Sequence, residues 1–257
     1  MSALVLPASP TFRLDGRRAL VTGAGRGIGL AAAAALAEAG AHVTLCARSL
    51  PEITSAAEAI GDTGGRADIL QLDVTDVDAV MATVAAVEPF NVLVNNAGAN
   101  RPNTVEKVSV ADFDFVMNLN VRAAYFMAQA VAKRLIEACL AGSIINMSSQ
   151  MGHVGGADRS LYCASKWAME GFSKSMAIDL APHRIRVNTI APTFIETPMT
   201  KPFFEDADFR DRVLAKIKLG RLGRVEDVTG AVVYLASDAS GLMTGSSMVI
   251  DGGWTAD

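Results

Sequence analysis

The sequence has few of the residues that hold metal ions or build disulfide frameworks. It contains three cysteines and three histidines in 257 residues, and neither set is clustered. An odd number of widely spaced cysteines fits neither a zinc site nor a disulfide scaffold. We therefore expect a protein without a metal centre. We expect its cysteines to be reduced, mostly buried thiols of a cytoplasmic protein.

The sequence has no excess of positive charge and no long apolar run. The formal net charge is −4 and the estimated pI is about 5.4, with no basic stripe, so we expect no nucleic-acid partner. No uncharged stretch reaches transmembrane length, and the N-terminus lacks the basic start of a secretory signal. We therefore expect no membrane partner. Residues 1–13, which include Pro7 and Pro10, are predicted to form a flexible lead-in.

Hydrophobic residues make up 51% of the chain and charged residues 19%, which suits a parallel sheet buried on both faces. Short apolar runs alternate with helical patterns, and we find no internal repeat or linker. The whole chain, 1–257, is therefore predicted to be one α/β domain: a doubly wound parallel sheet of about seven strands with helices on both faces. The strands are expected at 18–22, 42–48, 67–72, 91–95, 142–148, 184–191 and 247–253.

A glycine-rich turn follows the first predicted strand. It reads Thr22-Gly23-x-x-x-Gly27-x-Gly29 and leads into an alanine-rich helix at 30–39. A strand, a glycine turn and a helix in this order are typical of Rossmann-type dinucleotide sites, where the pyrophosphate lies at the helix N-terminus. An ordinary glycine turn is the alternative.

A tyrosine and a lysine four residues apart form the main candidate for catalysis. If a helix begins near Ser160, Tyr162 and Lys166 lie on the same face of it, and the ammonium should lower the pKa of the phenol. Such a phenol can exchange protons near neutral pH. Ser149 ends the preceding buried strand, at the sheet edge where ligands bind. By itself the tyrosine–lysine pair could be a chance feature of a solvated helix face.

Together these motifs resemble the short-chain dehydrogenase/reductase family, in its single-domain form of roughly 250 residues. The resemblance extends from about Leu14 to Gly253 and includes Asn95-Asn96-Ala97-Gly98 and Asp251-Gly252-Gly253. Its nearest varieties are gluconate 5-dehydrogenases and 3-oxoacyl-carrier-protein reductases. The resemblance implies an oxidoreductase with the catalytic set Asn120, Ser149, Tyr162 and Lys166. One departure is Thr193, where most family members have glycine after Pro192.

The resemblance also implies a role for each catalytic residue. Tyr162 is the general acid/base, Ser149 hydrogen-bonds the reacting oxygen, and Lys166 binds the nicotinamide ribose and lowers the pKa of Tyr162. An asparagine in the 110–140 helix holds a water that connects the lysine to solvent. Alignment favours Asn120 over Asn118 for this role.

Two arginines predict the type of cofactor. Arg48 ends the second strand, where NAD enzymes usually carry an acid, and Arg26 lies in the glycine turn. Guanidinium groups suit a 2′-phosphate, so NADP is expected and NAD is less favoured. Two solvated surface arginines are the alternative. Asp73 is expected to meet the adenine amino group, as in the family, or to cap a helix over 75–87, and both roles could apply together. The full cofactor set is Gly23, Arg26, Gly27, Ile28, Gly29, Arg48, Asp73, Val74, Asn96, Ala97, Gly98, Tyr162, Lys166, Pro192, Ile195 and Thr197.

The substrate is predicted less directly. Arg101, Gln150 and His153 are polar residues beside the motifs, and residues 193–212 form a long segment suited to a lid. Arg101 could pair with a carboxylate, as gluconate-type family members also have an arginine soon after Asn-Asn-Ala-Gly; it could equally be a solvated loop residue. We expect a small polar alcohol or ketone, with a sugar acid or polyol first. The alternatives are a 3-oxoacyl-carrier-protein reductase and a non-catalytic NADP-binding regulator.

An assembly of several copies is also expected. The predicted helices 110–140 and 160–183 have more apolar positions than one sheet face can cover. Family members commonly pair across these helices. A homo-oligomer, with a tetramer as first choice, is therefore predicted, and a monomer with an apolar surface is the alternative.

Overall fold

The computed structural model describes residues 6–198 and 200–256 and contains the predicted parallel sheet of seven strands. The strand order is β3-β2-β1-β4-β5-β6-β7, and every neighbouring pair is parallel. The doubly wound architecture is confirmed. The strands are β1 (Arg18–Thr22), β2 (His42–Ala47), β3 (Arg66–Gln71), β4 (Val92–Asn95), β5 (Gly142–Met147), β6 (Ile185–Pro192) and β7 (Ser247–Ile250).

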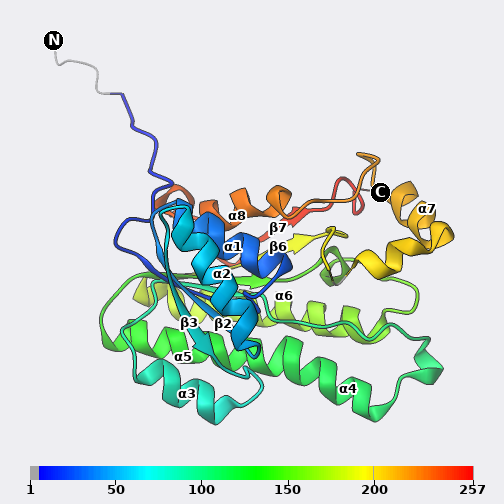
Figure 1. Cartoon of the computed structure of the whole chain (residues 1–257), viewed down its shortest axis with the longest axis horizontal. Helices are drawn as coiled ribbons and strands as arrows, with labels where there is room; N and C mark the ends of the chain where they lie inside the picture. Colours follow the sequence, from blue (N-terminus) through cyan, green and yellow to red (C-terminus); the bar gives the residue numbers. More distant parts are fainter. Residues whose placement is uncertain (1–5, 199, 257) are drawn as a thin grey trace.

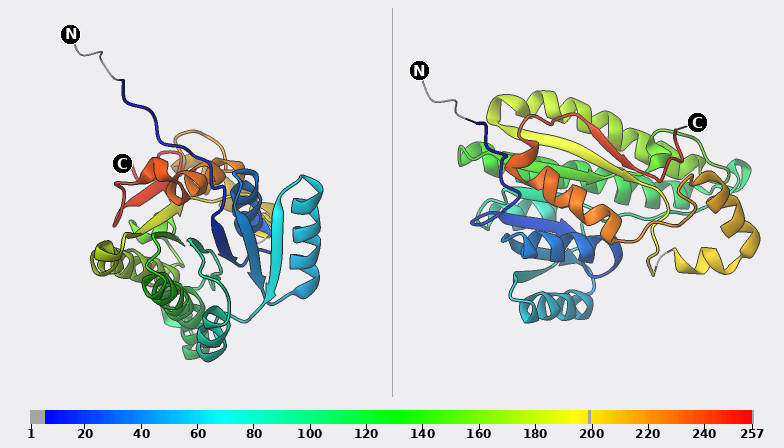
Figure 2. Two further views of the ribbon diagram at one scale, coloured as in Figure 1. Left: turned by 90° about the vertical axis from the view of Figure 1, so that its left-hand side faces the viewer. Right: turned by 90° about the horizontal axis from the view of Figure 1, so that it is seen from above.

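Helices cover both faces of the sheet (Figures 1 and 2). One layer consists of α1 (Gly27–Glu38), α2 (Leu50–Asp62) and α8 (Glu226–Ala236). The other consists of α3 (Val77–Ala85), α4 (Val110–Met117), α5 (Ala124–Glu137) and α6 (Ser160–Leu180). A further helix, α7 (Ala207–Lys216), projects beyond the carboxyl ends of the strands.

Each face of the sheet has its own hydrophobic core. In β1, Ala19 and Val21 pack toward the α1 layer, whereas Leu20 packs toward the α5 layer. All three side chains are buried, which is why the strand is a continuous apolar run rather than an alternating one. Burial of a side chain such as Leu20 contributes about 1.5–3 kcal/mol to stability.

The long helix predicted over 110–140 is interrupted. Residues Asn118–Ala123 form a π-helical turn between α4 and α5. The side chain of Asn120 points inward from this turn and hydrogen-bonds the backbone of Ala99 and the hydroxyl of Ser165. A π-turn accommodates an extra residue, and such turns are frequent at functional sites. The single-helix prediction was therefore wrong at this point.

Asp73 does not cap the helix after β3. That helix, α3, begins two residues later than predicted, and its cap is Asp76, whose carboxylate accepts a hydrogen bond of 3.0 Å from the amide of Ala79. Asp73 instead accepts hydrogen bonds from the amide and hydroxyl of Thr75, at 3.0 and 2.7 Å. These bonds hold the pKa of Asp73 below its usual range.

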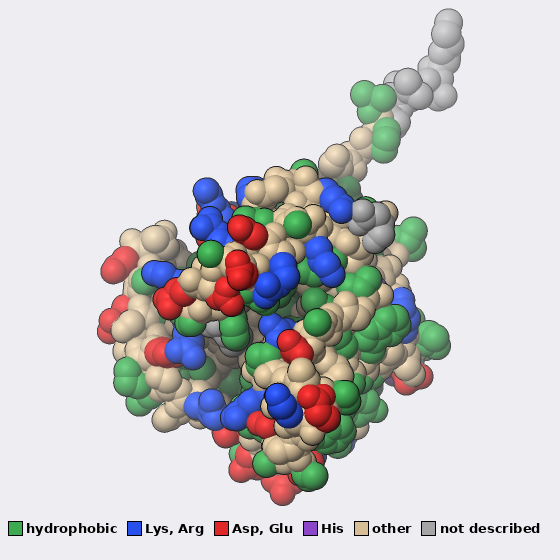
Figure 3. Space-filling model, turned by 90° about the vertical axis from the view of Figure 1, so that its right-hand side faces the viewer, with side chains coloured by type: hydrophobic (Ala, Val, Ile, Leu, Met, Phe, Trp, Pro, Cys, Tyr) green, Lys and Arg blue, Asp and Glu red, His purple; other side chains and the backbone are tan. Residues whose placement is uncertain are grey.

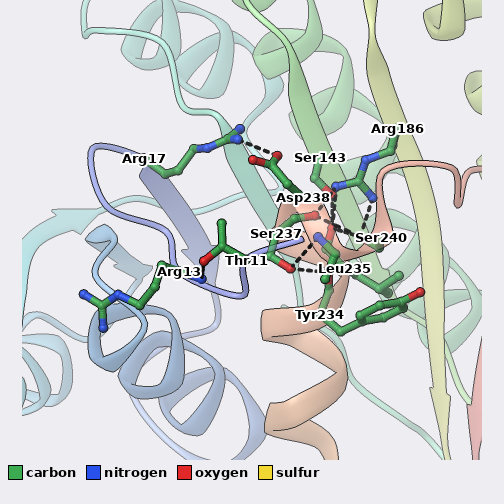
Figure 4. Close-up of polar contacts among 11 residues, drawn as sticks. Thr11, Arg13, Arg17, Ser143, Arg186, Tyr234, Leu235, Ser237, Asp238 and Ser240 are labelled. Carbon is green, nitrogen blue, oxygen red and sulfur yellow. Dashed lines mark hydrogen bonds and ion pairs between the residues drawn. The ribbon is translucent and has the colours of Figure 1, made fainter. Parts of the chain in front are cut away.

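A cluster of polar contacts fixes the C-terminal end of α8 (Figure 4). Arg186 reaches from β6 and donates to the carbonyls of Leu235 and Ser237, at 2.8 and 3.2 Å. The last carbonyls of a helix have no partner within it, so these bonds satisfy them. Arg17 joins the same region through an ion pair of 2.7 Å with Asp238.

The predicted lead-in, 1–13, begins outside the described residues, which start at Leu6. Its last residues are attached to the domain: the Phe12 ring lies 6.1 Å from that of Tyr234, and Arg13 donates to the carbonyl of Glu38 at 3.2 Å. The three cysteines are unpaired, but only Cys46 is fully buried and Cys139 is exposed, so the expectation of mostly buried thiols was wrong. None of the helices among the described residues combines the length and the hydropathy that a membrane span requires.

Candidate active site

A pocket of about 850 Å³ opens at the carboxyl ends of the strands. The strand order reverses between β1 and β4, which is where doubly wound sheets bind ligands. Figure 3 views this side of the molecule, where lysine and arginine side chains surround a hollow. The predicted residues that line the pocket are Gly23, Arg26, Gly27, Ile28, Arg48, Asp73, Val74, Asn96, Ala97, Gly98, Ser149, Gln150, Tyr162, Lys166, Pro192, Ile195 and Thr197.

The glycine turn packs tightly against the loop after β4. The Thr22 hydroxyl accepts hydrogen bonds from the amides of Asn96 and Ala97, at 3.0 and 3.1 Å. The Asn96 side chain donates to the carbonyls of Thr22 and Gly23. A Cβ at Gly29 would lie only 2.2 Å from the carbonyl oxygen of Gly23, so only glycine fits there. The turn from Gly23 to Gly29 at the start of α1, which we call the glycine cradle, therefore fits a dinucleotide pyrophosphate.

Both predicted arginines line the end of the pocket that adjoins the glycine cradle. Arg48 follows β2 and lines the pocket, and Arg26 projects from the glycine turn. Arg26 forms an ion pair of 3.2 Å with Glu52 on α2, an acid that sequence analysis did not single out. Because this pair is exposed, it is worth at most about 1 kcal/mol, and a phosphate can replace it. The charges at this end therefore suit a 2′-phosphate.

Ser149, Tyr162 and Lys166 come together at the other end of the pocket. Ser149 follows β5 in an extended conformation, and its hydroxyl lies close enough to Tyr162 to affect the pKa of the phenol. The Ser149 hydroxyl also donates to the side-chain oxygen of Gln150 at 2.7 Å. The Lys166 ammonium lies 5.5 Å from the centre of the Tyr162 ring and donates to the carbonyl of Met147 at 2.7 Å.

Burial dominates the acid–base properties of this group. It raises the pKa of Tyr162, opposed by the nearby hydroxyl of Ser149 and by the charge of Arg159. The sequence-based expectation, that Lys166 lowers the pKa of Tyr162, is therefore wrong for the protein without cofactor. Lys166 is only 5% exposed, and burial lowers its own pKa to about 8 although Glu170 opposes this.

A Lys166→Met variant should show what this burial costs. Below pH 8 the folded protein holds a charged lysine, and burial destabilises that charge. A fall of the lysine pKa from 10.5 to about 8 corresponds to a loss of roughly 3 kcal/mol in the free energy of unfolding. The hydrogen bond to Met147 offsets about 1 kcal/mol of this loss. The variant should therefore be about 2 kcal/mol more stable than the wild type at pH 6.5.

The stability advantage of Lys166→Met should depend on pH in one direction. Between pH 8 and 10.5 the unfolded wild type binds more protons than the folded one, so its stability rises with pH and the advantage shrinks. Urea unfolding of both proteins without cofactor at pH 6.5 and 9.5 measures the difference, in which other titrating groups cancel. An advantage that is absent at pH 6.5, or that grows with pH, contradicts this account.

Asn120 lies behind the pocket rather than in its wall. Its side chain is fully buried and bonds both backbone groups of Ala99 at 2.9 Å, and it donates to the Ser165 hydroxyl at 3.0 Å. Ser165 directly precedes Lys166 on α6. Of the two asparagines in this turn, Asn118 lines the pocket and Asn120 supports its floor.

The three predicted substrate residues are not brought together. Gln150 lines the pocket beside Ser149. Arg101 lies outside the lining, where its guanidinium forms an ion pair of 3.2 Å with Asp112 and stacks 4.5 Å from the Phe115 ring. Arg101 therefore already has partners at the protein surface.

His153 belongs to a polar cluster behind α6. Its Nε2 lies 2.9 Å from the hydroxyl of Ser247 and 3.4 Å from a carboxylate oxygen of the buried Glu170. The other oxygen of Glu170 accepts a hydrogen bond of 2.8 Å from Thr189. The cluster ties the segment after β5 to α6, β6 and β7, and His153 does not line the pocket.

The pocket also contains polar atoms without protein partners. Among the described residues, the side-chain oxygens of Asn100, Ser148 and Thr193 are buried and form no hydrogen bond. All three residues line the pocket, and a buried unpaired polar group is costly unless a ligand satisfies it. Sequence analysis missed these roles because single polar residues in loops carry no pattern. Arg159 was missed for the same reason.

Of the predicted lid segment, 193–212, only residues up to Phe203 line the pocket, and Met199 lies outside the described residues. The segment contains a short helical turn over Lys201–Glu205 and the beginning of α7. Thr197 comes within 3.5 Å of the position that a Cβ on Gly27 would occupy, and Phe203 also lines the pocket. The segment thus covers the region between the glycine turn and the tyrosine.

Known proteins are similar to this chain over almost its whole length. A family model described as enoyl-(acyl carrier protein) reductase matches residues 23–255. Gluconate 5-dehydrogenase of Gluconobacter oxydans is 40% identical over 95% of this chain and 96% of its own. D-erythrulose reductase of Gallus gallus is 39% identical over 95% of this chain and 98% of its own.

A solved structure matches equally well. The crystal structure of a gluconate 5-dehydrogenase from Burkholderia cenocepacia, in complex with NADP and tartrate, superposes with a TM-score of 0.92 at 36% identity, covering 96% of this chain and 98% of that chain. The chain belongs to the short-chain dehydrogenase/reductase family. It is an NADP-dependent oxidoreductase that acts on CH–OH groups.

Proposed function

We propose that the protein interconverts a small polar alcohol and its ketone, with a sugar acid or polyol as substrate and Tyr162 as general acid/base. The observation that carries the proposal is the meeting of Ser149, Tyr162 and Lys166 in one pocket with the glycine cradle. The related gluconate dehydrogenase and erythrulose reductase support this class of substrate.

In the direction of reduction, the Tyr162 hydroxyl donates its proton to the carbonyl oxygen of the substrate. A cofactor held by the glycine turn and Lys166 would supply the hydride for the carbonyl carbon, so that NADPH would be oxidised to NADP⁺ while the C=O bond is reduced to a CH–OH group. Ser149 hydrogen-bonds the same oxygen and orients it. Oxidation reverses these steps, and Tyr162 accepts the hydroxyl proton.

Lys166 and Asn120 support this proton transfer in the proposal. Lys166 binds the nicotinamide ribose, and the proton that Tyr162 loses is replaced through Lys166 and a water that Asn120 holds. The side chain of Asn120 is already bonded to Ala99 and Ser165, so these bonds fix the π-helical turn beside α6 and do not themselves hold the water. The remaining cofactor contacts are proposed for the lining residues between Gly23 and Thr197 named above, with Arg26 and Arg48 at the 2′-phosphate.

A spectrophotometric screen tests the proposed function. Sugar acids, polyols, simple ketones and 3-oxoacyl thioesters are offered with NADP⁺ or NADPH, and absorbance at the nicotinamide band is followed. We expect turnover of a sugar acid or polyol. A clear preference for the thioester would favour the carrier-protein alternative, and no turnover of any compound would favour a cofactor-binding regulator.

We also propose that the protein is a cytoplasmic homo-oligomer, with a tetramer as first choice. Large apolar side chains are exposed on α4 and α6, including Val110, Phe113, Trp167 and Ile178. A second copy of the chain is the occupant expected from the family resemblance, because members commonly pair across these helices.

Light scattering at micromolar concentration measures the oligomeric state. We expect a mass that is a multiple of 26.9 kDa, and Trp167→Glu should lower it because a charge replaces an apolar side chain at the interface. A wild-type mass of one chain contradicts the proposal.

A further inference from the structure

Arg159 places a buried positive charge in the catalytic pocket. The residue directly precedes α6, three positions before Tyr162, and lines the pocket together with Ser149 and Phe203. It is only 8% exposed, and burial lowers the pKa of its guanidinium. Its charge acts on Tyr162, whose pKa it lowers, so the guanidinium lies within electrostatic reach of the reacting hydroxyl.

Among residues 6–198 and 200–256, few groups accept a hydrogen bond from this guanidinium. One nitrogen donates to the backbone carbonyl of Asp158 at 3.3 Å, and the group lies 6.0 Å from the centre of the Phe203 ring. The carboxylate of Asp158 acts on it at longer range, without an ion pair. An arginine has five N–H donors in a planar fork that matches a carboxylate, so most of its donors are left for a ligand.

Resting on the proposed function, we propose that Arg159 binds the carboxylate of the substrate, which makes the enzyme selective for hydroxy acids such as sugar acids over neutral polyols. A bound carboxylate supplies a charged partner to a largely buried cation whose free N–H groups otherwise face only the water of the pocket. A neutral polyol offers the guanidinium only uncharged hydroxyl acceptors, which bind it less strongly than a carboxylate does.

Arg101, the residue that the sequence suggested for this role, is in a weaker position. Its side chain is 53% exposed and already pairs with Asp112, so a carboxylate there would have to replace an existing partner in water. Arg159 is buried, and among the described residues no carboxylate forms an ion pair with it. The two candidate sites therefore predict different results: an acid should bind more weakly after substitution of Arg159 in one case, and after substitution of Arg101 in the other.

The test uses paired ligands and three variants: Arg159→Gln, Arg159→Lys and Arg101→Gln. The first readout is the ratio of kcat/KM for gluconate to that for glucitol, its neutral counterpart. Arg159→Gln should lower this ratio at least ~30-fold, because a charge-assisted bond to the carboxylate is lost. Arg101→Gln should change it less than about threefold. Any effect of Arg159 on the pKa of Tyr162 applies to both substrates and cancels in the ratio.

The second readout does not depend on the choice of physiological substrate. Tartrate is tested as a competitive inhibitor of NADPH-dependent reduction of butane-2,3-dione, a neutral diketone. Its inhibition constant should rise at least ~30-fold in Arg159→Gln and less in Arg159→Lys, which keeps the charge but not the fork. The KM for NADPH should stay near the wild-type value and serves as a check on folding.

The outcomes separate the two proposals. If the wild type turns over neither gluconate nor glucitol while tartrate inhibits through Arg159, the proposed substrates are wrong and the carboxylate site stands. If gluconate and glucitol are turned over equally well and Arg159→Gln and Arg159→Lys leave tartrate inhibition unchanged, the proposed function stands and the carboxylate site is overturned. A larger effect of Arg101→Gln than of Arg159→Gln also overturns it.

Discussion

Replacing Tyr162 by phenylalanine is expected to lower kcat at least ~10²-fold, the usual loss when a positioned general acid is removed. The substitution removes one oxygen and keeps the ring, which packs with the cluster around Met151 and Trp254. The Lys166 ammonium keeps its bond to Met147, so the shape of the pocket should persist. Affinity for NADPH should therefore change little, as measured by fluorescence titration beside steady-state kinetics.

A matched control for this experiment is Tyr234→Phe on α8. It removes the same atom from a tyrosine that does not line the pocket, and kcat should remain within about twofold of the wild type. Near-normal turnover by Tyr162→Phe would remove the general acid/base role from this residue. A loss of NADPH binding in the same variant would point to a positioning role instead.

The second large effect is expected at Arg48. An Arg48→Asp variant should lose about 10²-fold in kcat/KM with NADP, because a charge-assisted bond to the 2′-phosphate is replaced by repulsion. With NAD, kcat/KM should rise roughly tenfold, since an acid at the end of β2 can accept a hydrogen bond from the ribose 2′-hydroxyl. The ratio of the two values, measured for one substrate, is the readout.

Arg66→Asp provides the matched control for the charge change. Arg66 begins β3, at the end of the strand opposite the pocket, so the same change of net charge should leave the cofactor ratio unaltered. Glu52→Gln sharpens the test, because it releases Arg26 from its ion pair and should lower the KM for NADP. Equal loss with both cofactors in Arg48→Asp contradicts a phosphate contact.

Sequence patterns predicted those parts of the site that depend on the backbone. The glycine turn was predictable because Gly29 meets the carbonyl of Gly23, and only one residue type allows that contact. The tyrosine and lysine were predictable because four-residue spacing on a helix places two side chains on one face. The sheet followed from short apolar runs that alternate with helices.

Side-chain partners were not predictable in the same way. Arg101 and Arg159 are both arginines near a motif, and only tertiary contacts show that one stacks on Phe115 at the surface and the other is buried beside Tyr162. His153 was misleading for a similar reason, because its partner Glu170 lies 17 residues along the chain (170 minus 153) on another element. The pKa of Tyr162 depends on burial, which spacing does not contain.

The pairing of β1 with β4 has a consequence for how the chain folds. Ala19 lies opposite Val92 in this pair, 73 residues later (92 minus 19), and no two neighbouring strands are joined by a hairpin. Pairings between distant segments form slowly because a long loop must close first. The glycine turn is synthesised early, yet the Asn96 side chain that holds its carbonyls arrives only with β4. The phosphate cradle therefore reaches its final shape after the middle of the sheet has closed.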